Sequence, residues 1–114
     1  MTPPERVEAG AVVPTGDGVQ WTLEESSDLN ANLVWLAPGH EVGEHVNDAV
    51  DVLVVVLAGG GRVVVDGDPL EVAPQTVVHV AKGSRRRIEA RGDGLRYLTV
   101  HRRRGPLSIG RRTS

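Results

Sequence analysis

Residues 39–67 read GHEVGEHVNDAVDVLVVVLAGGGRVVVDG, and this stretch decides the fold. Residues 52–57 form a continuous apolar run, which is typical of a strand that is buried on both faces. Glycines interrupt the run at 59–61, and the strand pattern resumes at residues 62–65, an arginine followed by three valines. Asp66-Gly67 is a strong hairpin signal, because a two-residue type I′ turn needs positive φ at both central positions. The stretch therefore predicts antiparallel strands joined by a tight turn.

The composition of the whole chain favours strands as well. Valine occupies 20 of the 114 positions, and β-branched side chains suit the pleated surface of a sheet. Fourteen glycines and seven prolines separate short apolar segments, which indicates turns at close intervals. A chain of this length is typical of one domain, so we predict a single all-β domain, either closed or built as a two-sheet roll. Further strands are predicted at residues 7–13, 19–23, 32–36, 70–72, 76–80, 85–90 and 95–101.

The sequence excludes several classes of protein. It contains no cysteine, so disulfides, thiolate metal sites and cysteine nucleophiles are excluded together. The longest apolar run, residues 52–58, has seven residues and is far too short to cross a membrane. The first six residues carry no apolar segment of a secretory signal. We therefore expect a cytoplasmic protein with no membrane partner.

Charge is distributed unevenly along the chain. Residues 1–57 carry a net charge of −9 and residues 58–114 a net charge of +7, although the whole chain is at only −2. Such asymmetry can mark a nucleic-acid surface, but the arginines near the C-terminus have no recognition helix or aromatic stacking platform beside them. We expect no nucleic-acid partner, and we interpret the asymmetry as complementary faces within one fold or across a homodimer.

Two spaced motifs resemble those of the cupin superfamily. Gly39, His45 and Gly59 match its first motif, which reads Gly, five residues, His-x-His, three or four residues, Glu, six residues, Gly. Residues 76–86 resemble the second motif, which reads Gly, five residues, Pro-x-Gly, two residues, His. The resemblance implies a small jelly-roll β-barrel of antiparallel strands, often paired as a homodimer, with a pocket inside. We expect an N-terminal strand or extension at residues 1–18, the barrel at 19–104 and a basic tail at 105–114.

The sequence departs from the family pattern at the metal ligands. Metal-binding cupins hold the ion with the two His and the Glu of the first motif and the His of the second. Here His45 stands at the first of these positions, Asn47 at the second and Arg86 at the last. The acid is Asp51 when counted from the first His, but Val52 when counted back from the closing glycine. An amide is a weak ligand and a guanidinium is none, so we expect no metal cofactor.

Two alternatives stay open. In the first, Fe, Mn, Ni or Zn is bound through His45 with ligands from outside the motifs, and the protein is an oxygenase, isomerase or cyclase. The histidines available for this are His40, His79 and His101, but they have no ligand spacing and are interpreted as surface or structural residues. In the second, the protein is a purely structural or regulatory partner that binds no ligand.

Without a metal, the polar groups of the pocket provide the chemistry. We predict that the pocket binds a small polar or anionic organic molecule, with Arg86 holding a carboxylate or enolate. The alternative is that Arg86 only neutralises Asp51 or points to solvent. His45 and Asp51 are candidates for a catalytic acid–base pair of the isomerase, cyclase or dehydratase type. The predicted ligand-binding residues are His45, Asn47, Arg86, Trp35, Tyr97 and His101.

Overall fold

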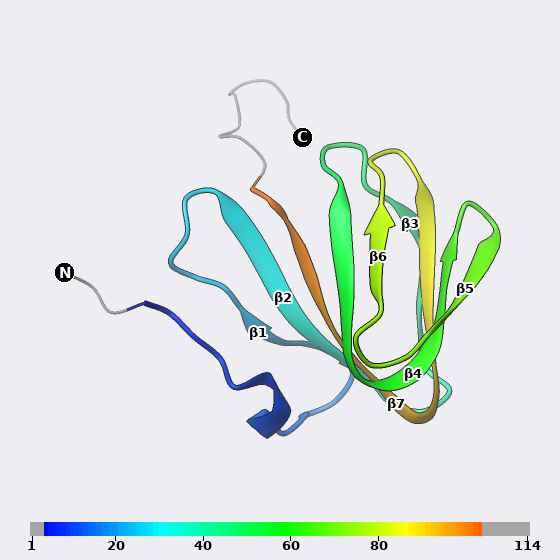
Figure 1. Ribbon diagram of the computed structural model, residues 1–114, viewed down its shortest axis with the longest axis horizontal. Coiled ribbons are helices and arrows are strands. Elements are labelled where there is room, and N and C mark those ends of the chain that lie inside the picture. Colours follow the sequence, from blue (N-terminus) through cyan, green and yellow to red (C-terminus); the bar gives the residue numbers. More distant parts are fainter. Residues whose placement is uncertain (1–3, 104–114) are drawn as a thin grey trace.

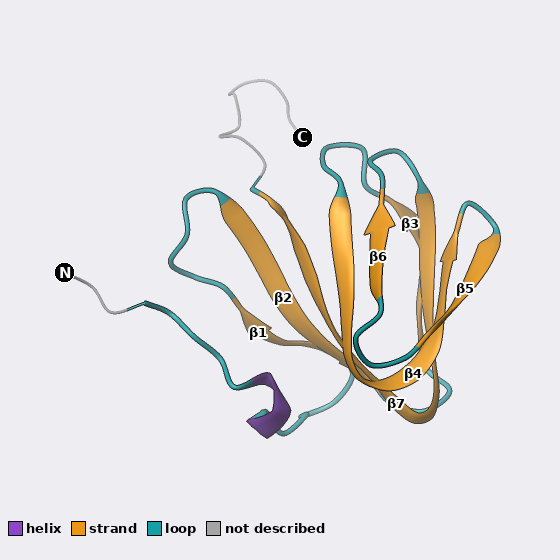
Figure 2. Cartoon of the chain, in the orientation of Figure 1, coloured by secondary structure: helices purple, strands orange, loops and turns teal. Residues whose placement is uncertain are grey.

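The computed structural model describes residues 4–103, and over this range the chain folds into seven β-strands and one short helical turn (Figure 2). This confirms the predicted all-β class. Within the same range there is no helix that is long and apolar enough to cross a membrane. The predicted basic tail at 105–114 lies outside the described residues. The strands are β1 (Gly18–Thr22), β2 (Leu29–Leu36), β3 (Glu41–Val46), β4 (Val52–Val65), β5 (Asp68–Val72), β6 (Val77–Val80) and β7 (Arg85–Arg102).

The two longest strands, β4 and β7, pair with each other and connect the remaining strands into one sheet. All strand pairs are antiparallel, in the order β1-β2-β7-β4-β5, with β3 added to β7 and β6 added to β4. Figure 1 shows β4 and β7 bending together at the lower edge of the view, so that each contributes to two layers. The β2 layer contains β1, β2, the second half of β7, the first half of β4, and β6. The β3 layer contains β3, the first half of β7, the second half of β4, and β5.

This arrangement is the jelly roll that the sequence predicts, with one difference. Strand pairing among the described residues does not close the sheet into a barrel, because β1, β3, β5 and β6 each pair with a single strand. The end of the molecule away from the bend, where β3 and β6 end, is called the upper end below, after its place in Figure 1.

Glycines make the bend of the long strands possible. Gly59 and Gly94 have φ angles of 78° and 92°, a conformation that residues with side chains disfavour. A Cβ atom on Gly59 would collide with the carbonyl oxygen of Gly94, and one on Gly61 would collide with the carbonyl oxygen of Glu89. The backbones of β4 and β7 thus approach each other at the bend more closely than side chains would allow.

The core lies between the two layers. Successive residues of a strand point to opposite faces, so one side chain in two along each strand faces inward. On β2, for example, Val34 and Leu36 are in register with the inward-facing Tyr97 and Leu95 of β7. Burial of these side chains is the main contribution to the stability of the fold. The buried core residues are Val34, Leu36, Val50, Val52, Val54, Val56, Val63, Val72, Val78, Val80, Ile88, Ala90, Leu95 and Tyr97.

The structure corrects several predicted strand boundaries. The glycine-rich segments 59–61 and 92–94 lie inside continuous strands, since glycine lets the backbone bend while pairing to the neighbouring strand resumes on either side. Residues 41–46, for which no strand is predicted, form β3 and pair with β7. The count of strands is therefore lower than the number of predicted apolar segments.

The N-terminal segment is not the strand predicted at residues 7–13. It contains a short 3-10 turn, Ala9–Ala11. The guanidinium of Arg96 donates hydrogen bonds to the carbonyl oxygens of Ala9 (2.6 Å) and Val12 (2.8 Å). Arg96 is in register with Trp35 on the outward face of the β2 layer. A side chain, rather than strand pairing, therefore holds this segment against the outside of the layer.

Candidate functional site

His45 and Arg86 meet at the upper end of the inner face. They are register partners on β3 and β7, and Nη2 of Arg86 lies 2.8 Å from Nε2 of His45. A bulge follows Val42 in β3, so that Val42 and His45 both face inward. A guanidinium only donates hydrogen bonds, so Nε2 of His45 is the acceptor.

Arg86 is a cation with unused hydrogen-bond donors. Its neighbours on the same face of β7, Ile88 and Ala90, are 1% and 3% exposed, so Arg86 also points into the molecule. Nε and Nη1 of Arg86 are shielded from solvent and have no partner among the described residues. Burial lowers the pKa of this guanidinium, whereas the nearby Tyr97 has the opposite effect. Arg86 as a whole is half-buried, and a cation partly withdrawn from water without a carboxylate partner is unfavourable unless another group binds it.

Tyr97 supplies a neutral hydroxyl close to this cation. The residue is 3% exposed. Burial raises the pKa of its hydroxyl to about 12, against the opposing effect of the Arg86 guanidinium. The hydroxyl therefore keeps its proton at neutral pH, and can both donate and accept a hydrogen bond. Thr99 and His101 follow on the same inward face of β7, farther from the bend.

The inner face of β2 carries two asparagines that the sequence analysis does not single out. Asn30 and Asn32 are the register partners of His101 and Thr99. They alternate in phase with the core residues Val34 and Leu36, and therefore face inward. Thr22 of β1 is in turn the register partner of Asn32. The sequence pattern alone does not give this direction, because apolar residues of β2 are buried on both faces, and the predicted strand begins only at residue 32.

Asn47, a predicted ligand-binding residue, shapes the turn that follows β3. Its side-chain Oδ1 accepts hydrogen bonds from the backbone N–H groups of Ala49 (3.0 Å) and Val50 (3.2 Å). Its backbone carbonyl oxygen accepts one from the N–H of Gly83, at 2.8 Å. The side-chain oxygen is thus already engaged in local structure, as is typical of asparagine in turns.

Asp51 lies on the outside of the molecule and is not paired with His45. Its carboxylate accepts a hydrogen bond from the backbone N–H of Lys82 (2.8 Å) and pairs with Nε2 of His79 (3.1 Å). The Lys82 N–H and, to a lesser degree, His79 lower the pKa of Asp51. Val52, 2% exposed, takes the inward position. The expected His45–Asp51 pair is therefore not formed, because a shift of one residue turns a side chain to the opposite face.

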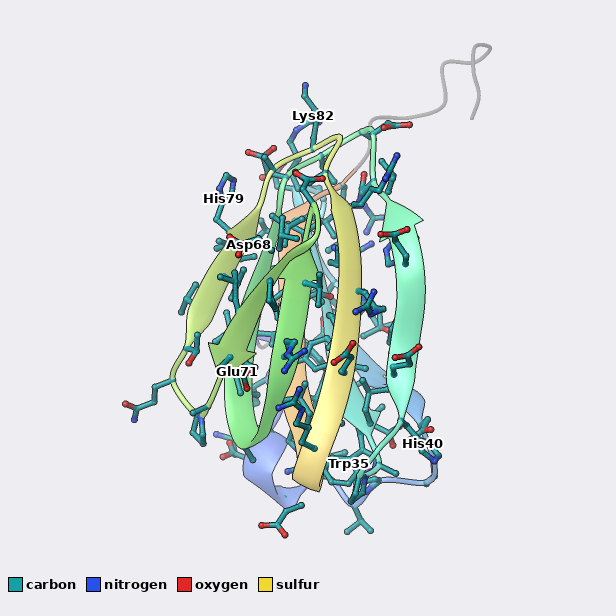
Figure 3. The ribbon with its side chains drawn as sticks, turned by 90° about the vertical axis from the view of Figure 1, so that its right-hand side faces the viewer. Trp35, His40, Asp68, Glu71, His79 and Lys82 are labelled. Atoms are coloured by element: carbon teal, nitrogen blue, oxygen red, sulfur yellow. The ribbon has the colours of Figure 1, made fainter. Side chains whose placement is uncertain are left out.

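Trp35, predicted to line the pocket, lies away from His45 and Arg86. Its register partner is Arg96 on the outward face of the β2 layer, and its ring lies against Gly94 at the bend. Figure 3 shows Trp35 near the lower end of the molecule, opposite to the end that carries Lys82. This corrects the expected placement. Strand alternation sends Trp35 outward, since its neighbours along β2 face the core.

The residues at the family's metal-ligand positions do not form a set of metal ligands. Arg86 occupies one position and donates to His45, so it engages the imidazole lone pair that a metal would need. Val52 occupies the acid position, and the side-chain oxygen of Asn47 is bound in a turn. Within residues 4–103 no three His, Asp or Glu side chains are grouped so as to hold a metal ion. The donor chemistry therefore does not fit a divalent cation at this place.

Comparison with solved structures places the fold among known proteins. KdgF from a Halomonas species superposes over 91% of this chain and 96% of its own, with a TM-score of 0.76 and 16% sequence identity. A cupin superfamily protein from Desulfitobacterium hafniense superposes over 86% and 91%, with a TM-score of 0.71 and 22% identity. A predicted oxalate decarboxylase from Thermotoga maritima is 24% identical over 64% of each chain, with a TM-score of 0.62. At sequence identities this low, the similarity to these structures shows the fold alone.

Sequence comparison supplies the family. A search of curated protein sequences finds no match. The model of the cupin domain family, however, matches residues 32–101, which include the whole of β3 to β6 and most of β2 and β7. Because this match spans more than half of the sequence, the chain belongs to the cupin domain family.

Proposed function

We propose that this protein binds a small organic carboxylate on the inner face of its jelly roll, with Arg86 as the anchor and without a metal ion. The observation that carries the proposal is that, within residues 4–103, the Arg86 guanidinium lacks some of its hydrogen-bond acceptors and a compensating negative charge. Two of its nitrogens are shielded from solvent and unpartnered among the described residues. Its third nitrogen contacts His45, an imidazole that carries no negative charge to compensate the guanidinium. An anionic ligand would supply the missing charge, and also the missing acceptors once the side chain turns to expose Nε and Nη1.

The chemistry of the guanidinium favours a carboxylate. Hydrogen bonds between ionised partners are roughly twice as strong as neutral ones, and a guanidinium can present two parallel N–H groups to the two oxygens of a carboxylate. His45 and Tyr97 support this arrangement in different ways. His45 holds one end of the guanidinium in place through its 2.8 Å contact with Nη2. Tyr97 contributes a protonated hydroxyl rather than a competing negative charge, since its pKa is about 12.

Calorimetric titration with hexanoate and gluconate tests the proposal on the wild-type protein, Arg86→Gln and Arg87→Gln. Arg87 is the matched control, because it follows Arg86 in β7 but pairs with Glu89 at 2.8 Å on the other face. We expect Arg86→Gln to weaken carboxylate binding about tenfold or more, and Arg87→Gln to leave it unchanged. Absence of binding to the wild-type protein, or equal weakening by both substitutions, would refute the proposal.

Metal content separates this function from the metalloenzyme alternative. The protein is dialysed against salts of Fe, Mn, Ni and Zn in turn, and its metal content is then measured by elemental analysis. We expect no stoichiometric retention, because the donors at the family's ligand positions do not form a ligand set. Near-stoichiometric metal that is lost in His45→Ala would contradict the proposal and favour a metal-dependent reaction.

A further inference from the structure

We infer that the carboxylate ligand bound by Arg86 also carries hydroxyl groups, and that a second subsite forms hydrogen bonds with these hydroxyls. This subsite is the amide row, defined here as Thr22, Asn30 and Asn32 on the inner face of the β2 layer. The inference rests on the proposed function, and it adds the part of the ligand that lies beyond the carboxylate.

The position of the amide row is unusual for polar residues. Asn30 and Asn32 share the inward face of β2 with Val34 and Leu36, which are 7% and 2% exposed. The chain thus changes from apolar to polar side chains along one face of one strand, toward the upper end. None of the three residues of the amide row is fully exposed. A face that served only the core would continue with apolar residues.

The amide row is linked by its own hydrogen bonds. The Thr22 hydroxyl donates to Oδ1 of Asn32 at 2.8 Å, and Nδ2 of Asn32 donates to Oδ1 of Asn30 at 3.4 Å. These contacts orient the side chains but use only part of their capacity, since each amide has two N–H donors and each oxygen two lone pairs. The remaining donors and acceptors are all neutral. Such groups match hydroxyls, which also donate and accept, better than they match an ionised group.

The amide row is continuous with the Arg86 anchor through β7. Asn32 is in register with Thr99, which follows Tyr97 on the same inward face. The bend of β7 places Arg86 on the inner face of the β3 layer and Thr99 on the inner face of the β2 layer, so the anchor and the amide row face each other toward the upper end. Packed layers lie about 10 Å apart, a separation that a short carbon chain between the two sets of side chains can bridge. A ligand with its carboxylate at Arg86 therefore presents hydroxyls on its chain to the amide row.

Calorimetric titration with three probes of similar length tests the inference. Hexanoate has the carboxylate alone, gluconate has a carboxylate and hydroxyls, and sorbitol has hydroxyls alone. We expect the wild-type protein to bind gluconate about tenfold more tightly than hexanoate, as one or two additional hydrogen bonds would give, and to bind sorbitol weakest. In Asn32→Leu, the affinity for gluconate should fall to that for hexanoate, while hexanoate binding stays unchanged.

The possible failures are distinguishable. Equal affinity for gluconate and hexanoate would refute hydroxyl binding by the amide row but leave carboxylate binding by Arg86 intact. No binding of either carboxylate would refute the proposed function and the inference with it. Equal weakening of both ligands by Asn32→Leu would assign Asn32 a structural role and also overturn the inference. Thr22→Val, on a different strand, removes the hydroxyl at nearly constant shape and gives the same test should Asn32→Leu fail to fold.

Discussion

The lower and upper halves of the inner face are built from different chemistry. Near the bend the side chains are apolar and almost completely buried, with none above 1% exposed: Val56, Val63, Ile88 and Leu95. Toward the upper end the inner face is mixed: β4 and β6 keep the buried valines Val52, Val54 and Val80, whereas β2, β3 and β7 carry the polar residues His45, Arg86, Asn30, Asn32 and Thr99. The difference teaches where stability and binding reside. Apolar residues of both halves stabilise the fold, and the polar residues of the upper half leave hydrogen-bonding groups unpaired that an apolar core would not contain.

The largest effect is expected at the bend that closes the lower half. Gly59→Ala places a side chain where φ is 78° and where a Cβ would collide with the carbonyl of Gly94. We expect a loss of about 3 kcal/mol or more in the free energy of unfolding, measured by urea denaturation, because strain and steric overlap add. Gly43→Ala is the control, since nothing lies within 4 Å of its Cβ position. A Gly59→Ala protein as stable as Gly43→Ala would show that the bend does not depend on this close approach.

The upper half should respond in the opposite direction. Arg86→Met removes a cation whose Nε and Nη1 are buried and unpartnered among the described residues. We expect a gain of at most about 1 kcal/mol in the free energy of unfolding, since Arg86 is half-buried and apolar replacement of an uncompensated charge withdrawn from water is often stabilising. The same substitution should abolish carboxylate binding. Arg87→Met, which breaks an outward ion pair with Glu89, should change stability little. A marked loss of stability in Arg86→Met would instead assign Arg86 a structural role.

The smallest effect is expected outside both halves, at Asp51. The Lys82 N–H and His79 lower its pKa in the folded protein below the ordinary value of 3.8. A lowered carboxyl pKa stabilises the fold above about pH 4, and the contribution disappears as the pH falls through the folded value. Asp51→Asn should therefore lower the melting temperature slightly at pH 7 and less at pH 2, as measured by circular dichroism. A loss of equal size at both pH values would exclude this ionic origin.

Much of the fold was predictable because its signals are local. The hairpin at Asp66-Gly67 is confirmed, with φ angles of 51° and 83°, and it joins β4 to β5. The apolar run at 52–57 lies within β4 as predicted. The N-terminal segment was not predictable in the same way. Its conformation depends on Arg96, more than 80 residues away in the sequence, which binds the carbonyl of Ala9.

The site was less predictable, since it depends on which face each side chain takes. Arg86 lies between two other arginines, and only its phase with Ile88 turns it inward. For the acid position, counting from either end of the motif gives Asp51 or Val52, and the register of β4 decides for Val52. The asparagines of β2 were hidden for a related reason. Their inward direction depends on pairing with β7, which no local pattern reveals.

The central place of β7 has a consequence for the order of events during protein synthesis. β7 comes last among the described strands, yet it pairs with β2, β3 and β4, and it is the only strand partner of β3 in residues 4–103. Until the ribosome has released β7, the emerging chain can form the β1–β2, β4–β5 and β4–β6 pairs, but it cannot join β1–β2 and β3 to them. Folding of the nascent chain is therefore expected to occur late and in one step, as is typical of topologies dominated by distant contacts.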